Sequence, residues 1–372
     1  MKVMNYSRKD PMVSPPSFIT TTSLGSLDIR PNIQFAADSY VHTPLPDTAP
    51  IDVNSTGYVL DLTNKIRDNY QHMDATIVKS PIYVVGSDVP TVPVSNALKQ
   101  PDGTIKDFPP LDAKWSAVPI PDDFYTNTNP AVPEDEIQCI YQPSTDTIWE
   151  FWWMSKTGTK VMNSSGVMVD GWQAAWGGRM DSVSTNKGFW ITDPVNGATY
   201  GANATGIPHL AGIMTIQELQ IGVINHPLGF AVPNPSVTHR FPAQRGDGGD
   251  LNPLAVQEGM VMRFPYNLDL TTLSLTPFAL MICKAIQKYG MVCWDWSGVC
   301  GFRLEGFGNP GVTYSDNTNP YWSLGGILAC PTTVKTNGLD NGYLNCWPPA
   351  HFSNVPWDKL VVVDVSYFNK WK

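Results

Sequence analysis

The clearest pattern along the chain is a pair of alternating apolar runs between residues 136 and 156, separated by four turn-forming residues, Pro143 to Asp146. Such a pattern predicts a β-hairpin. Because side chains alternate along a strand, the second run has two apolar faces. The expected faces are Ile148, Glu150 and Trp152 on one side and Trp149, Phe151 and Trp153 on the other. A strand covered on both sides belongs in the middle of stacked sheets, so Glu150 is expected to be buried or at the floor of a cleft.

Other short apolar runs, separated by Gly-rich or Pro-rich turns, predict further strands. They lie at 171–178, 188–192, 221–232 and 260–265. Residues 290–306 predict a second hairpin with its loop at Asp295 to Gly298, and residues 356–368 predict a last strand that closes the sheet. This spacing is typical of a mainly β protein, and we expect a concanavalin-like or jelly-roll two-sheet sandwich.

One or two short helices are expected to interrupt the sheets. Thr215 with Glu218 forms a capping-box pattern at the start of a short helix. A second helix is predicted over residues 277–289, between a proline and Gly290. Nearer the N-terminus, helical spacing begins after Asn54 or Ser55. The apolar positions that show it are Val59, Leu62, Ile66 and Tyr70.

The chain divides by composition into an arm and a body. Residues 1–50 are rich in Pro, Ser, Thr and Asn and predict an extended arm that lies on the body or on a neighbouring subunit. Residues 51–372 would form the sandwich domain. Within it, residues 306–350 predict a long loop insertion of the kind that is functional or lies against a partner.

Composition and charge narrow the classes of function. Charged residues make up 15% of the chain, whose formal net charge is −9, so no basic surface for nucleic acid is expected. No apolar run is long enough for membrane insertion, and the first residues do not form a secretory signal peptide. The six cysteines lack zinc-site spacing, so we expect no metal site and no cofactor.

Two cysteine pairs leave the redox state open. Cys293 and Cys300 flank the expected second hairpin, where a cross-strand disulfide is geometrically possible. Cys330 and Cys346 follow in the long loop. Without a signal peptide, buried thiols are the expected state.

The stretch from Gln142 to Trp190 holds six of the thirteen tryptophans, with charged residues among them. Indole rings beside carboxylate, amide and guanidinium groups are suited to holding sugars. The same rings also suit an aromatic core, which local pattern alone favours. The expected glycan-binding residues are Trp149, Trp152, Trp172, Trp176, Arg179, Gln244 and Arg245.

Three residues are candidates for catalysis, although none is firm. Glu150 with Asp181 could supply the two carboxyl groups of a glycosidase, and His226 could be the base of a polysaccharide lyase. A structural ion pair between Glu150 and Arg179 is the simpler alternative. For His226, a structural hydrogen bond is the corresponding alternative.

Many ordered blocks between Ile137 and Asp358 resemble a β-rich family of actinobacteria and their phages. They include QPSTDTIWEFWW, GWQAAWGGRMDSVS, ATGIPHLAG, TIQELQIGVINHPLGFAVP, FPAQRGDGG and VQEGMVMRFP. The resemblance is to uncharacterised exported bacterial proteins and to phage minor tail proteins. It implies a concanavalin-like or lyase-like β-sandwich and carries no verified catalytic residue. The expected setting is a virion, assembled in the host cytoplasm.

Three hypotheses follow. The first is a virion protein of the minor tail or receptor-binding type that binds a host surface polysaccharide, with other virion subunits as partners and a homo-oligomeric state. The second is a glycan-degrading enzyme, either a hydrolase or a lyase, on the same sandwich. The third is a purely structural virion protein.

Overall fold

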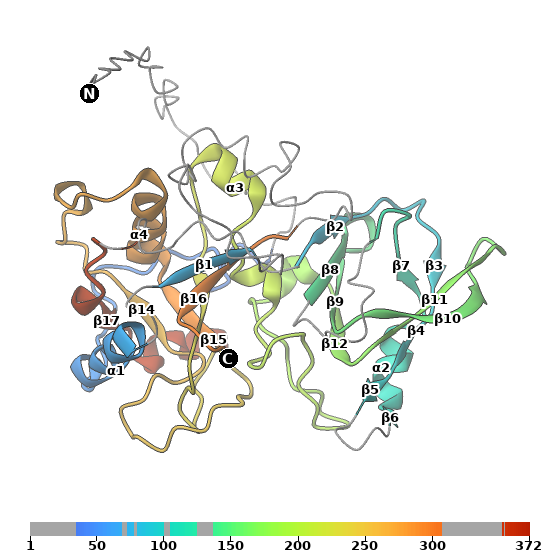
Figure 1. The fold of residues 1–372 in the computed structure, drawn as a ribbon, viewed down its shortest axis with the longest axis horizontal. Coiled ribbons are helices and arrows are strands. Elements are labelled where there is room, and N and C mark those ends of the chain that lie inside the picture. The colour runs from blue at the N-terminus through green and yellow to red at the C-terminus, as the bar shows by residue number, and fades with distance from the viewer. Residues whose placement is uncertain are drawn as a thin grey trace, which may run out of the picture.

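A computed structural model shows a mainly β protein in which several sheets are combined with a few helices (Figure 1). The structure describes residues 35–68, 73–77, 80–99, 105–124, 137–306, 352 and 354–372. The loop expected at 306–350 and the cysteines Cys330 and Cys346 therefore lie outside the described residues, apart from Gly306. The same holds for the first 34 residues of the expected arm.

The predicted first hairpin is confirmed and lies at the centre of a four-stranded sheet. Its strands, in sheet order, are β12 (Trp176–Asp181), β9 (Thr147–Trp152), β8 (Ile137–Gln142) and β2 (Ile82–Val84). The turn between β8 and β9 is a 3-10 segment that ends at Asp146 with a left-handed backbone. Strand β9 is buried on both faces as far as Phe151, which is the arrangement that its two apolar faces predicted.

A second group of small sheets lies next to the four-stranded sheet, on the right of Figure 1. Three strands form one sheet: β10 (Ser155–Met162), β11 (Met168–Ala174) and β4 (Val94–Asn96). The two-stranded sheets pair β3 (Thr91–Val92) with β7 (Val118–Pro119) and β5 (Leu98–Lys99) with β6 (Ile105–Lys106). The short helix α2 (Pro109–Lys114) follows β6.

The largest sheet has six strands and a mixed topology. In sheet order they are β1 (Asp74–Ile77), β16 (Gly301–Leu304), β13 (Leu228–Val232), β15 (Met291–Trp296), β14 (Val261–Arg263) and β17 (Val361–Val362). The pairs β1–β16 and β13–β15 are parallel. As predicted, the last strand, β17, closes one edge of this sheet, although the 3-10 segment Val365–Trp371 follows it at the end of the chain.

The predicted second hairpin is wrong. Strands β15 and β16 are not paired with each other, because β13 is inserted between them and bonds to both. Cys293 on β15 therefore pairs with Phe230 of β13, and no cross-strand disulfide to Cys300 is formed. The two residues are buried thiols, as are Cys139 and Cys283.

The expected strand at 188–192 is also wrong. This segment forms bends and coil, because its backbone bonds to a loop rather than to a strand: Trp190 N donates to Gly206 O over 2.8 Å. The Phe189 and Trp190 side chains are nevertheless buried.

The predicted helices are confirmed. They are α1 (Ser55–Asp68), α3 (Ile216–Ile221) and α4 (Pro277–Tyr289). Thr215 caps α3 with the reciprocal bonds of a capping box to Glu218. Further 3-10 segments are Val183–Thr185, His209–Ala211, Leu270–Thr272 and Trp357–Lys359.

Two hydrophobic cores lie on opposite faces of the six-stranded sheet. Along β15, Val292 and Trp294 belong to the core shared with the four-stranded sheet, whereas Met291 and Cys293 face the core formed with α1 and α4. Part of the expected arm also packs on the body: Leu45 is buried, and its backbone N donates to Lys288 O. The chain segment before α1 therefore contributes to the first core.

Candidate functional site

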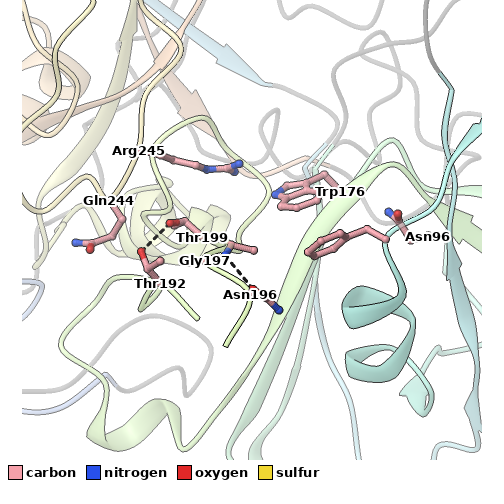
Figure 2. A pocket seen from close by; sticks show the side chains of 10 residues that line it. Asn96, Trp176, Thr192, Asn196, Gly197, Thr199, Gln244 and Arg245 are labelled. Carbon is pink, nitrogen blue, oxygen red and sulfur yellow. Dashed lines mark hydrogen bonds between the residues drawn. The ribbon is translucent and has the colours of Figure 1, made fainter. Parts of the chain in front are cut away.

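A pocket of about 470 Å³ opens beside the first residue of β12. One wall consists of Trp176 with Phe108, which precedes α2. The opposite wall is formed by the loop at 192–199 and by Gln244 and Arg245. Figure 2 shows the guanidinium of Arg245 pointing toward the indole of Trp176 across this space. The pocket thus joins segments that are far apart in the sequence.

The aromatic wall is built around Trp176. Its ring is half-buried and lies nearly parallel to the ring of Tyr200, with the two centroids 6.4 Å apart. The centroid of the Phe108 ring lies 5.4 Å from that of Trp176. Gly178, two residues further along β12, allows this packing, because a Cβ there would meet Tyr200 Cβ at 2.8 Å. The parts of Trp176 and Phe108 that remain exposed make this wall of the pocket apolar.

The cationic side is Arg245, whose guanidinium lies 5.7 Å above the Trp176 ring. Its Nη2 donates to Gly201 O over 3.0 Å and to Asn203 O over 2.7 Å, which fixes the position of the group. Within the described residues, neither Nε of Arg245 nor Nε1 of Trp176 has a hydrogen-bond partner. Both atoms are buried, so each carries the cost of about 1–3 kcal/mol of an unsatisfied donor, and neither is open to a ligand in the pocket.

The loop that carries Gln244 and Arg245 is folded around a buried carboxyl group. Glu258 accepts hydrogen bonds from the backbone N–H groups of Asp247, at 2.9 Å, and Gly248, at 3.4 Å. The backbone N of Gln244 bonds to Thr205 O over 2.8 Å. Burial, together with the nearby Asp247 charge, raises the pKa of Glu258 to about 8, despite the N–H donors.

Hydroxyl and amide groups complete the pocket wall. Thr192 Oγ1 and Thr199 Oγ1 share a hydrogen bond of 2.8 Å, and Asn196 Nδ2 donates to the Tyr200 hydroxyl over 2.9 Å. Gln244 Nε2 donates to Pro242 O over 3.1 Å. An apolar wall beside fixed donors and acceptors is the arrangement that a small polar ring compound, such as a sugar, requires.

Glu150 lies away from this pocket, in the interior. Its side chain is fully buried and accepts hydrogen bonds from Ala202 N at 3.3 Å and His209 N at 2.6 Å. Burial raises the pKa of Glu150 to about 7, while the N–H donors act in the opposite direction. Of the two expected positions, buried or at the floor of a cleft, the structure shows the buried one.

The expected ion pair between Glu150 and Arg179 is wrong. In the β9–β12 register Glu150 is opposite Gly178, whereas Arg179 is opposite Trp149, so the two side chains point to different faces of the sheet. Arg179 instead lies 5.6 Å from the Trp149 ring centroid and forms a 2.8 Å ion pair with Asp181.

The same register separates Glu150 from Asp181. Asp181 pairs with Thr147, three residues from Glu150, and accepts a hydrogen bond from the Thr147 hydroxyl on that face. A glycosidase needs its two carboxyl groups on either side of one bond. Two groups on opposite faces of a sheet cannot meet this condition, so the proposed hydrolase pair is wrong.

His226 is also placed in the interior. Its ring is fully buried, with Nε2 at 3.0 Å from Glu218 Oε1 and Nδ1 at 2.7 Å from Pro227 O. It does not line the pocket. These contacts match the structural role that was the alternative to a lyase base.

The remaining indoles are divided between core and partial exposure. Trp149 and Trp172 are buried, at 3% and 7% exposure, so they cannot offer a ring to a ligand without rearrangement. Trp152 is half-buried and stacks on Trp153 with centroids 4.4 Å apart. Of the seven expected glycan-binding residues, the pocket brings together Trp176, Gln244 and Arg245.

The rest of the pocket was not predicted from the sequence, namely Asn96, Phe108 and the loop at 192–199. The run TDPVNGATYGAN could have indicated a polar loop, because Thr and Asn recur there between turn-forming residues. Phe108 carries no comparable signal, since it is a single aromatic residue before two prolines.

Two further findings concern the described residues alone. They include no group of three or more His, Cys, Asp or Glu side chains that could hold a metal ion. None of their helices has the length and apolarity to cross a membrane.

Comparisons with protein-family models, with curated proteins and with solved structures find no match to the chain. The site must therefore be interpreted from its own geometry.

Proposed function

We propose that the protein is a virion component, of the minor tail or receptor-binding type, that binds a polysaccharide of the host cell envelope. The observation that carries the binding function is the convergence of Trp176, Gln244 and Arg245 in one open pocket. The virion setting rests on the sequence resemblance alone.

Within the mainly β class, we propose that the fold is a concanavalin-like or jelly-roll sandwich. The separate four-stranded and six-stranded sheets support it, whereas the parallel strand pairs count against a purely antiparallel version.

The pocket has the two properties that a sugar site needs. The C–H groups of a pyranose can pack against the exposed parts of Trp176 and Phe108, while the Arg245 and Gln244 side chains lie beside them to meet its hydroxyl groups. A single pocket of this size binds one or two sugar units weakly. Repeated copies in a homo-oligomer would add avidity on a repetitive polysaccharide.

Other virion subunits, and further copies of this chain, would contact surfaces away from the pocket, and assembly would take place in the host cytoplasm. The N-terminal arm is a candidate for such contacts because residues 1–50 are rich in Pro, Ser, Thr and Asn.

The binding function is tested with an array of neutral and acidic cell-envelope glycans, including arabinogalactan fragments, and the Trp176→Ala variant. We expect the wild-type chain to bind a subset of the glycans and the variant to lose that binding. The matched control is Trp296→Ala, because Trp296 is 46% exposed and does not line the pocket. Equal binding by wild type and Trp176→Ala would exclude this pocket as the site.

The same comparison separates the alternatives. If the wild-type chain binds no glycan and added protein does not compete with phage adsorption, the structural virion protein is the better hypothesis. A glycan-degrading activity would appear as product release from a bound glycan. No observation favours it at present, because Glu150 and Asp181 are on opposite faces of the sheet and His226 is buried beside Glu218.

A further inference from the structure

The pocket is more positive than the protein that contains it. Arg245 is the one charged side chain among the described residues that line it, and none of these residues carries a carboxylate. The whole chain, by contrast, has a formal net charge of −9. A lone cation at a ligand-sized pocket in an acidic protein indicates a preference in ligand charge.

Part of the Arg245 guanidinium is left for a ligand. Nη2 is occupied by the carbonyls of Gly201 and Asn203, and Nε is buried. Nη1 makes no hydrogen bond to a described residue, and Arg245 lines the pocket. Because Nη2 donates to two backbone carbonyls, the guanidinium is held in position, and the N–H groups of Nη1 can donate to an acceptor that enters the pocket.

The charge of Arg245 is only partly compensated by its surroundings. Three carboxyl groups lie close enough to act on it electrostatically, those of Asp247, Asp295 and Glu258. Asp295 forms its own ion pair with Arg303, at 2.7 Å. Burial raises the pKa of Glu258 to about 8, so this group is mostly protonated near neutral pH. Asp247 is exposed, where water screens its charge.

We propose that the pocket selects an acidic sugar, such as a uronic acid, with the carboxylate at Nη1 of Arg245 and the ring against the exposed parts of Trp176 and Phe108. This inference rests on the proposed glycan-binding function and specifies its ligand class. A hydroxyl group would also accept a hydrogen bond from the charged guanidinium, but the carboxylate adds the attraction between opposite charges, and this attraction distinguishes the acidic ligand from a neutral sugar of the same shape.

The test compares methyl glucuronide with methyl glucoside, which share a pyranose ring and differ in a carboxylate or a hydroxymethyl group. Binding of each is titrated by NMR up to the solubility limit of the ligand. For wild type we expect the glucuronide to bind on the order of tenfold more tightly, with a preference that decreases as salt is added. Arg245→Gln should abolish the preference and keep the weaker binding of the glucoside, while Arg245→Lys should restore part of it.

Each outcome decides a different question. Equal affinity of the two ligands for wild type, with both lost in Trp176→Ala, would overturn the acidic preference and leave the glycan-binding proposal standing. A preference retained in Arg245→Gln would likewise overturn the role of Arg245 in selecting an acidic sugar and leave the glycan-binding proposal standing. If neither methyl glycoside binds to wild type, the acidic-sugar proposal fails for this ligand pair, and the glycan-binding proposal fails with it when the glycan array also shows no binding. A circular dichroism spectrum of each variant, matched to wild type, excludes unfolding as the cause.

Discussion

Replacing Glu150 by glutamine should change how the stability of the protein depends on pH. The Glu150 carboxyl is fully buried, and burial raises its pKa from an ordinary value of 4.5 to about 7. Below pH 4.5 the group is protonated in both the folded and the unfolded chain. As the pH rises from 4.5 to about 7, the unfolded chain loses this proton while the folded chain keeps it, so the free energy of unfolding decreases.

The size of this effect follows from the shift. A pKa that moves from 4.5 to about 7 corresponds to about 3 kcal/mol, at about 1.4 kcal/mol for each tenfold change in proton affinity. Above pH 7 both states are ionised, and the whole cost remains. Glu150→Gln removes the titration, so this contribution to the pH dependence should disappear.

The variant also has a pH-independent cost, which must be separated from the titration. The two carboxyl oxygens accept from His209 N and Ala202 N, whereas a glutamine amide offers only one acceptor oxygen. One buried N–H then loses its partner, at about 1–3 kcal/mol. Because this penalty is constant, the informative quantity is the difference in slope with pH.

Urea unfolding followed by tryptophan fluorescence, from about pH 5 to about pH 8, measures both chains under the same conditions. Glu258 and Glu305 also have raised pKa values, but they contribute equally to wild type and variant. The control is Asp170→Asn, because ion pairs with Lys156 and Lys160 lower the pKa of Asp170 to about 2, outside this pH range. If the gap between wild type and Glu150→Gln is the same at both ends of the range, the buried carboxyl has an ordinary pKa and the reasoning is wrong.

Two further substitutions test the fold. Gly229→Ala on β13 would place a Cβ 2.3 Å from the buried indole of Trp294, so we expect a loss of about 1–3 kcal/mol in the free energy of urea unfolding, and an unchanged midpoint would contradict this packing. Thr215→Ala removes the side-chain half of the capping box on α3 and should lower the free energy of unfolding by about 1 kcal/mol, whereas Thr215→Ser should retain most of the stability. Equal thermal midpoints for the two variants would argue against the cap.

The local elements were determined largely by nearby residues. Helix α4 begins at Pro277 and ends before Gly290 because a proline suits the first helical turn and a glycine readily takes the positive φ at the end. The hairpin of β8 and β9 follows from alternation and a four-residue turn. In both cases the interactions that decide the structure lie within a few residues of one another.

The order of strands in the six-stranded sheet was decided by distant parts of the chain. Residues 291–304 have the pattern of a hairpin, but β13, more than sixty residues earlier, bonds to both of its strands. A strand's own sequence records which faces are apolar and not which neighbour fills its hydrogen bonds. The predicted hairpin was therefore wrong, and the buried thiols expected for Cys293 and Cys300 are confirmed.

Residue types and alternation were enough to predict that indoles, an arginine and an amide were available for a sugar site, and that Glu150 would be buried or at the floor of a cleft. Which of these side chains lie close enough to act together depends on the pairing of strands and the packing of loops. The register of β9 with β12 places Glu150 and Arg179 on different faces, because a shift of one residue reverses the face of a side chain. The folding of the 244–248 loop around Glu258 brings Arg245 to Trp176, and such contacts between remote segments depend on the packing of the whole chain.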